Sequence, residues 1–289
     1  MNLVRVGVRA ARRMGRTLQR RLLTPTVPEV SLRYFGPWER LKLQRMLHWH
    51  QGEFDPRHVM WKGGQEEVRT LRPFLTDPAL LPQPPRLVME LGCGSGRSAL
   101  WLRRAMRWET TRWLLVDGHA PVFGAVEDSK ESLTTSQGGF AIDTPTALTF
   151  YSDFDLTDRL LCSNGMSRYT LIDLRTEARP PSEWRGGQDP PVQVDLLYSF
   201  SAVGLHFDPT WVMNQYGLHD VLAPGALVIF GTRTSTHPDF RRVNWPRFLA
   251  CGYERLRVVR GDKDYVLCRR MVGVGVTEHL DQEQVEQTL

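Results

Sequence analysis

The sequence has no apolar run that approaches the ~18 consecutive residues needed to span a bilayer as a helix. It also has little cysteine: Cys93, Cys162, Cys251 and Cys268 are scattered along 289 residues, and none forms a Cys-x-x-Cys pair. Zinc sites and secreted disulfide scaffolds need closely patterned cysteines, so we expect neither. This cysteine usage suits a reducing compartment, and we expect a cytoplasmic protein without a bound metal.

Acidic residues are missing altogether from residues 1–22, which contain seven arginines. Apolar residues recur there at near-helical spacing, so the arginines fall on the other face. This pattern predicts a basic amphipathic helix over 1–23 that suits an anionic membrane surface. The protein would then be a peripheral protein at the inner face of the membrane. Two alternatives stay open, a mitochondrial presequence with a matrix location and a solvated tail.

Residues 23–289 have no excess of positive charge. The formal net charge is +5, from 37 basic and 32 acidic residues. Without the seven N-terminal arginines, 30 basic residues face the 32 acidic ones. A body of this kind argues against nucleic acid as a partner.

Residues 24–85 are expected to form a helical extension or lid, with one helix that starts at Pro37 and another over 65–75. His48, His50 and His58 are an alternative metal site within it. Positions i and i+2 of a helix do not share a face, however, so we interpret this segment as packing or cover for a ligand site.

From residue 86 the pattern changes to short apolar strands that alternate with helices, which implies βαβ units and a mostly parallel sheet. The last two strands differ, because four residues separate them and favour an antiparallel hairpin. We therefore expect a Rossmann-like α/β fold over 86–271 with a seven-stranded sheet, followed by an acidic tail at 272–289. The expected strands are 87–89, 113–116, 169–172, 194–200, 226–230, 255–259 and 264–268, with a helix over 98–106.

The segment Glu90-Leu91-Gly92-Cys93-Gly94-Ser95-Gly96 follows the first expected strand and opens a helix. Glycine allows tight turns and lets a ligand approach the backbone. Arg97 stands where a dinucleotide-binding loop needs glycine or alanine, and Glu90 would repel a pyrophosphate. The loop therefore favours a cationic cofactor over a dinucleotide.

This segment resembles the first motif of class I S-adenosylmethionine-dependent methyltransferases, an acidic residue followed by x-Gly-x-Gly-x-Gly. The resemblance extends from about residue 86 to 270 and implies S-adenosyl-L-methionine as the cofactor. It implies that Glu90 positions the methionine end and that Gly92, Gly94 and Gly96 line the cofactor.

Further positions fit this resemblance. Asp117 ends the second expected strand, where the family holds the ribose hydroxyls, and two acceptor oxygens suit a vicinal diol. A turn-capping aspartate is the alternative for Asp117. Asp173 ends the third strand, and the resemblance places it near the adenine. Residues 222–226 resemble the family's Leu-x-Pro-Gly-Gly turn, with Ala226 in place of the last glycine.

The methyl acceptor is expected beside two segments, 150–157 and 198–207. They resemble a bacterial group of sugar O-methyltransferases found with surface-polysaccharide biosynthesis, from which Asp153 and Leu205 depart. The resemblance implies a small-molecule or glycan hydroxyl as the acceptor, with a sugar favoured.

A general base for such a hydroxyl is sought after the fourth strand, because ligands of open α/β sheets bind at the carboxyl ends of strands. His206 is the first candidate, and Tyr198 and Asp208 follow. A purely structural role for His206 is the alternative. Two rival functions remain, an RNA or protein methyltransferase and a non-catalytic cofactor-binding assembly factor. No Asn-Pro-Pro-Tyr motif follows the fourth strand, which argues against transfer to an amino group.

Overall fold

The computed structural model describes residues 35–37, 39, 68–117, 153–174, 177, 181–184, 193–200, 209, 210, 213, 217–232, 245–259 and 264–272. Several predicted features lie outside these residues. They are the basic helix over 1–23, most of the extension with His48, His50 and His58, the base candidates His206 and Asp208, and the tail from 273 onward.

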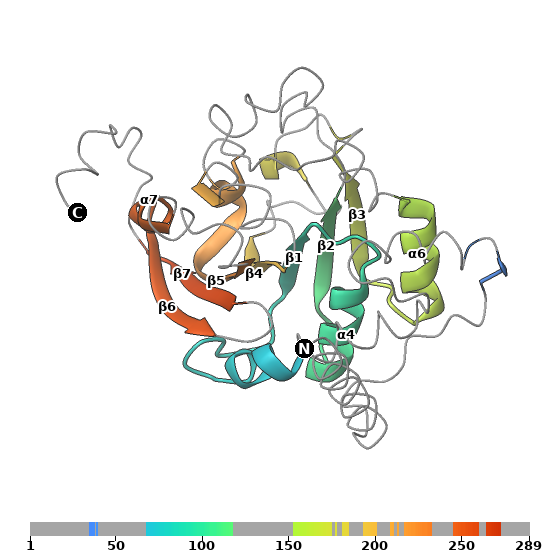
Figure 1. The fold of residues 1–289 in the computed structure, drawn as a ribbon, viewed down its shortest axis with the longest axis horizontal. Helices are drawn as coiled ribbons and strands as arrows, with labels where there is room; N and C mark the ends of the chain where they lie inside the picture. Colours follow the sequence, from blue (N-terminus) through green and yellow to red (C-terminus); the bar gives the residue numbers. More distant parts are fainter. Residues whose placement is uncertain are drawn as a thin grey trace, which may run out of the picture.

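A seven-stranded sheet with the order β3-β2-β1-β4-β5-β7-β6 forms the centre of the described chain (Figure 1). The first five strands pair in parallel, and β7 runs antiparallel to both of its neighbours. This arrangement confirms the predicted fold class. The strands are β1 Leu87–Leu91, β2 Arg112–Asp117, β3 Tyr169–Asp173, β4 Val194–Ser199, β5 Leu222–Thr232, β6 Tyr253–Val259 and β7 Asp264–Arg270.

Apolar side chains leave both faces of the sheet, because successive residues of a strand point to opposite sides. On one face they meet α4 (Arg97–Met106), α6 (Phe154–Ser163) and a helical segment over 68–75. On the other face they meet the short helices η3 (Pro181–Glu183), η5 (Leu218–Val221) and α7 (Trp245–Ala250), or residues beside them. The described chain is therefore a three-layer α/β structure. None of its helices is long and apolar enough to cross a membrane.

Residues 68–85, which the sequence assigned to the extension, belong to the same core as the sheet. Val68, Leu71 and Leu75 are buried in the cluster that also holds α4 and α6. The Arg269 side chain of β7 donates to the carbonyl oxygens of Ala79 and Leu80, at 2.9 and 3.2 Å. Packing therefore joins this stretch to the sheet.

The fifth strand differs from its prediction. It begins at Leu222, which pairs with Val194, but the next pair is Leu196 with Leu227. Residues 223–226 therefore form an irregularity inside β5, where Gly225 has a φ of 77°. The predicted turn at 222–226 exists as a bulge within the strand, and its glycine supplies the left-handed backbone that the bulge requires.

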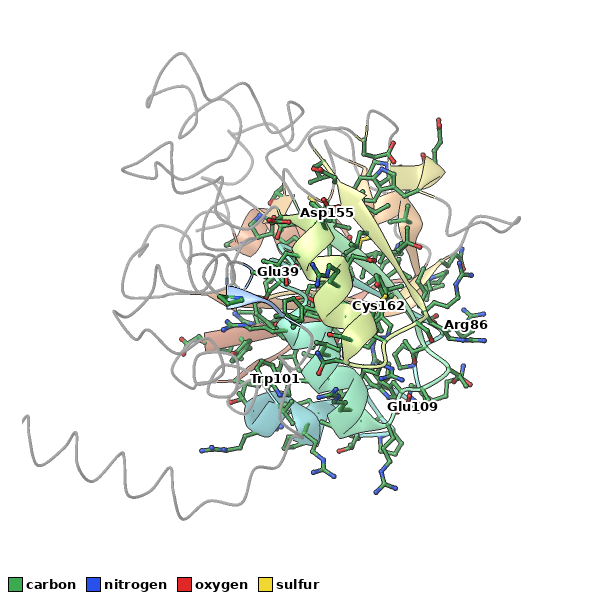
Figure 2. All side chains as sticks on the ribbon, turned by 90° about the vertical axis from the view of Figure 1, so that its right-hand side faces the viewer. Glu39, Arg86, Trp101, Glu109, Asp155 and Cys162 are labelled. Atoms are coloured by element: carbon green, nitrogen blue, oxygen red, sulfur yellow. The ribbon has the colours of Figure 1, made fainter. Side chains whose placement is uncertain are left out.

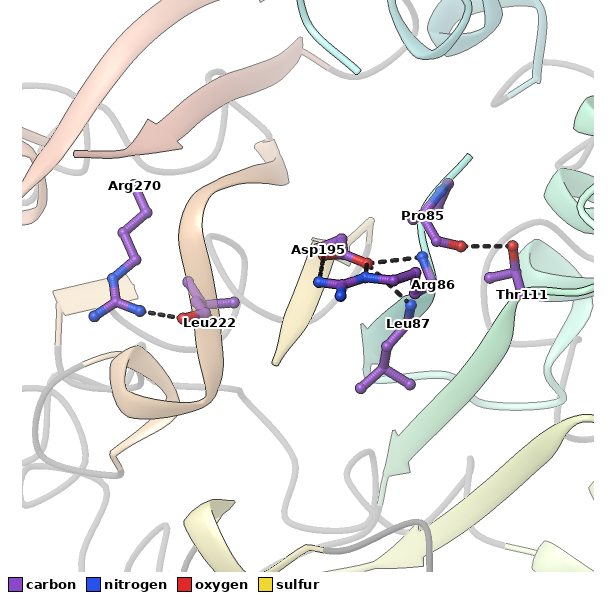
Figure 3. A network of polar contacts seen from close by, with 7 residues as sticks. All are labelled: Pro85, Arg86, Leu87, Thr111, Asp195, Leu222 and Arg270. Atoms are coloured by element: carbon purple, nitrogen blue, oxygen red, sulfur yellow. Dashed lines mark hydrogen bonds and ion pairs between the residues drawn. The ribbon is translucent and has the colours of Figure 1, made fainter. Parts of the chain in front are cut away.

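A polar network closes the edge of the sheet where the parallel strands begin (Figure 3). The Asp195 carboxylate of β4 accepts hydrogen bonds from the backbone N–H groups of Arg86 and Leu87, at 2.7 and 3.3 Å, and pairs with the Arg86 guanidinium. The Thr111 hydroxyl donates to the Pro85 carbonyl at 2.7 Å. This network fixes the starts of β1, β2 and β4, and leaves the opposite, carboxyl edge for a ligand.

Candidate cofactor site

The glycine loop joins the carboxyl end of β1 to the start of α4. Its first turn is fixed by the neighbouring strand, because the N–H groups of Gly92 and Cys93 both donate to the Val116 carbonyl, at 2.8 and 3.1 Å. Gly92, Gly94 and Gly96 have φ values of 73°, 54° and 69°. Side chains with a Cβ rarely adopt this backbone, so the turn itself requires glycine at all three positions.

Gly94, at the centre of the loop, is held from both sides. Its N–H donates to the carboxylate of Asp117, at the end of β2. Its carbonyl oxygen accepts a hydrogen bond of 2.9 Å from the buried hydroxyl of Thr157, on α6. Asp117 thus holds the backbone of the loop at Gly94, in addition to the ribose contact that the resemblance implies.

Gly96, at the start of α4, is explained by packing. A Cβ at this position would lie 2.7 Å from Cδ2 of Leu161 on α6. The side chain of Leu161 is fully buried and has little freedom to move. The missing Cβ therefore lets α4 and α6 approach closely, beside any role in lining a cofactor.

We expect Gly96→Ala to lower the free energy of unfolding by about 2–4 kcal/mol, through overpacking against Leu161 and left-handed strain. Gly165→Ala is the matched control, because Gly165 has a φ of 76° and no atom within 4 Å of an added Cβ. Urea unfolding of both variants measures the difference. Equal destabilisation of the two would show that the Leu161 contact contributes nothing.

Acidic side chains gather where the parallel strands end. Asp117 and Asp173 stand side by side, because their Cα atoms are partners in the register of β2 and β3. Glu90 is the fourth residue of β1, so it lies in the strand rather than in the loop, and it is buried. Three acidic residues at or near the carboxyl ends of neighbouring strands favour a cationic ligand over a phosphate there.

Cys93 adds no further charge to this loop. Burial, followed by the negative charges of Asp117 and Glu90, raises the pKa of its thiol well above the ordinary value. The side chain therefore stays protonated and acts as a small apolar group.

Tyr198, a base candidate from the sequence, lies on β4 directly beside Glu90 of β1. Its side chain is fully buried, and its hydroxyl donates to Oε2 of Glu90 at 2.8 Å. Phe200 stacks on its ring, with 4.5 Å between centroids. These contacts assign Tyr198 to holding Glu90 in place, and we do not propose it as a base for an acceptor.

Ser95 is the one loop residue whose polar side chain has nothing to bind among the described residues. It is 3% exposed, and its hydroxyl has no hydrogen-bond partner in that part of the chain. Buried hydroxyls are nearly always paired, so an unpaired one in a glycine loop indicates a polar ligand. The loop thus fits a cofactor that offers polar groups at the start of α4.

Helix α6 is the part of the site that the sequence did not predict. The predicted acceptor segment 150–157 is described from Asp153, whose carboxylate accepts from the Leu156 N–H at 3.0 Å and caps the helix. From there the helix packs on the glycine loop, through Thr157 and Leu161. The described part of the segment therefore supports the glycine loop, and a place for this segment beside the acceptor stays a prediction. The aspartate cap before an apolar, helical pattern was the signal available in the sequence.

Metal-binding residues do not converge in the described part of the chain, which holds no group of three His, Cys, Asp or Glu side chains suited to a metal. All four cysteines are free thiols. The histidines of the alternative metal site are outside the described ranges.

Comparison with known proteins gave matches among solved structures alone. No protein-family model matches the sequence. No curated protein matches it either. The O-methyltransferase TomG of Streptomyces achromogenes is similar, with 15% identity, a TM-score of 0.45 and coverage of 84% of this chain and 93% of that chain.

Two further structures are similar to the same degree. An O-methyltransferase from Bacillus cereus has 11% identity and a TM-score of 0.43, covering 83% of this chain and 93% of its own. A methyltransferase from Pyrococcus furiosus has 14% identity and a TM-score of 0.43, covering 71% and 81%. At these values the assignment of the fold rests on the strand order and pairing of this chain itself. A seven-stranded sheet of order β3-β2-β1-β4-β5-β7-β6, with five parallel strands and β7 antiparallel to both of its neighbours, gives this protein a Rossmann-like α/β fold.

Proposed function

We propose that the protein binds S-adenosyl-L-methionine at the glycine loop and transfers its methyl group to an acceptor. The observation that carries the proposal is the carboxyl edge of the sheet, where three left-handed glycines turn the chain between Glu90, Asp117 and Asp173. A sulfonium cofactor is cationic, and its ribose and amino acid offer the polar groups that such an edge can bind.

Each residue of the candidate cofactor site has a defined role in this proposal. Glu90, oriented by Tyr198, borders the methionine end, and the unpaired hydroxyl of Ser95 suits a polar group there. Asp117 accepts from the ribose hydroxyls, and Asp173 borders the adenine. The bound cofactor supplies an electrophilic methyl group with a good leaving group. The protein must then orient an acceptor and accept its proton.

For the acceptor we propose the hydroxyl of a small molecule or glycan, with a sugar favoured. The support is the resemblance of the segments 150–157 and 198–207 to sugar O-methyltransferases, together with the near-neutral body of the chain. His206 is the proposed base and Asp208 the second candidate. The test supplies S-adenosylmethionine with a tritium-labelled methyl group and measures transfer of that group to a panel of nucleotide sugars and oligosaccharides. Label that appears only in RNA or protein substrates would contradict it.

The rival without catalysis is a cofactor-binding assembly factor. Calorimetry with S-adenosylhomocysteine separates binding from turnover. Binding without transfer to any panel member, RNA or protein favours the assembly factor, whereas an absence of binding contradicts the cofactor proposal itself.

We expect Asp117→Ala to weaken binding of S-adenosylhomocysteine by about 10–100-fold, since bonds to a charged group contribute about 1.5–3 kcal/mol each. Two losses contribute, the ribose contact and the hydrogen bond from the Gly94 N–H. Asp117→Asn should lose less, because its amide oxygen still accepts from that N–H. Calorimetry measures all three proteins. A loss under twofold in the alanine variant would remove Asp117 from the site.

A further inference from the structure

We propose that Thr157 is a positioning residue for the cofactor loop, acting through the Gly94 carbonyl, an inference that rests on the proposed function. Thr157 is 1% exposed, and its hydroxyl donates to that carbonyl at 2.9 Å. The two residues are 63 positions apart in the sequence. Without this bond, the buried Gly94 carbonyl would lose the hydrogen bond from Thr157.

The bond sets the orientation of one peptide unit. A trans peptide is planar, and its C=O and N–H point in opposite directions. Because Thr157 holds the Gly94 carbonyl toward α6, the N–H of Ser95, in the same peptide unit, points away from α6. The Gly94 N–H is held separately by Asp117. The peptides on either side of Gly94 are thus both fixed before a ligand arrives, so little ordering remains for the ligand to impose.

Helix α6 is itself anchored firmly enough to act as the support. Leu161, one turn after Thr157, packs where Gly96 lacks a Cβ. At the end of the helix, the Arg104 guanidinium of α4 donates to the backbone oxygen and the side-chain oxygen of Asn164, each at 3.0 Å. Arg159 forms an ion pair with Glu39, and Figure 2 shows Glu39 next to α6. The helix thus joins the loop to α4 and to the segment before the sheet.

The test compares two buried threonines that make the same kind of bond. Thr111 is also 1% exposed and donates to a backbone carbonyl, that of Pro85, at 2.7 Å, but at the opposite edge of the sheet. Thr157→Val and Thr111→Val each remove one hydroxyl and keep the shape of the side chain. Calorimetry with S-adenosylhomocysteine and urea unfolding are measured for both.

We expect both valine variants to lose similar stability. Only Thr157→Val should weaken the binding of S-adenosylhomocysteine, by about five- to twentyfold. The reason is that the loss of this one buried hydrogen bond leaves the loop peptide disordered. Thr157→Ser keeps the donor and should bind within about twofold of the wild type. If Thr157→Val does not fold, Thr157→Cys and Thr111→Cys form the same pair with a weaker donor.

Two results would contradict the inference and leave the proposed function standing. One is wild-type affinity in Thr157→Val or Thr157→Cys, and the other is an equal loss of affinity in the matched Thr111 variant. Failure of the proposed function looks different, since the wild-type protein itself would then not bind S-adenosylhomocysteine.

Discussion

Replacing Gly94 by leucine is expected to abolish binding of S-adenosylhomocysteine, with at least about a hundredfold loss of affinity. The residue has a φ of 54°, and both its N–H and its carbonyl are engaged, by Asp117 and Thr157. A branched side chain here strains the backbone by about 1–2 kcal/mol. It also fills the space in which a ligand approaches the loop. The turn can relieve the strain only by releasing one of the two hydrogen bonds.

Gly225→Leu is the matched control for this substitution. Gly225 has a φ of 77° and no atom within 4 Å of an added Cβ, and it lies in the bulge of β5 at the other edge of the sheet. It therefore carries the backbone strain without a ligand nearby. Calorimetry measures the affinity of both variants, and circular dichroism checks that the sheet stays folded. Equal affinity in the two folded variants would remove the glycine loop from the cofactor site.

The strands could be predicted because they are short apolar runs, and their mostly parallel pairing follows from strand–helix alternation, whereas the order of the strands comes from the structure. Four residues between the last two apolar runs also indicated the antiparallel pairing of β6 with β7. The bulge in β5 was missed for a physical reason. Residues 222–226 carry Pro224 and Gly225, which favour a turn locally, but pairing of Leu222 with Val194 extends the strand across them.

The site was predictable only where its chemistry is local in the sequence. The motif Glu90–Gly96 is seven consecutive residues, so the tight turn after β1 could be predicted directly from its glycines. Thr157 and Tyr198 reach the loop or its strand across 63 and 108 positions, and no local pattern encodes such contacts. For this reason Tyr198 was predicted on the acceptor side, whereas the structure buries its hydroxyl against Glu90.

Replacing the proposed base, His206→Asn, is expected to lower the rate of methyl transfer by about 10²–10⁴, the usual contribution of a general base. Asparagine keeps a polar side chain of similar reach but cannot take a proton. The affinity for S-adenosylhomocysteine should stay within about twofold, because the residue is proposed to serve the acceptor. The rate is measured with the best acceptor of the nucleotide-sugar and oligosaccharide panel, and the affinity by calorimetry.

The dependence on pH and on the acceptor separates a base from a structural histidine. An imidazole accepts a proton only when neutral, so the wild-type rate should rise with pH around ~6.5, and the variant should lack this rise. The loss should be larger for a sugar hydroxyl than for a more acidic phenol, which needs less help to lose its proton. A variant that keeps the wild-type rate and pH profile would make Asp208 the next candidate. A variant that loses rate equally at every pH, and equally with both acceptors, would indicate that His206 supports the fold around the acceptor instead.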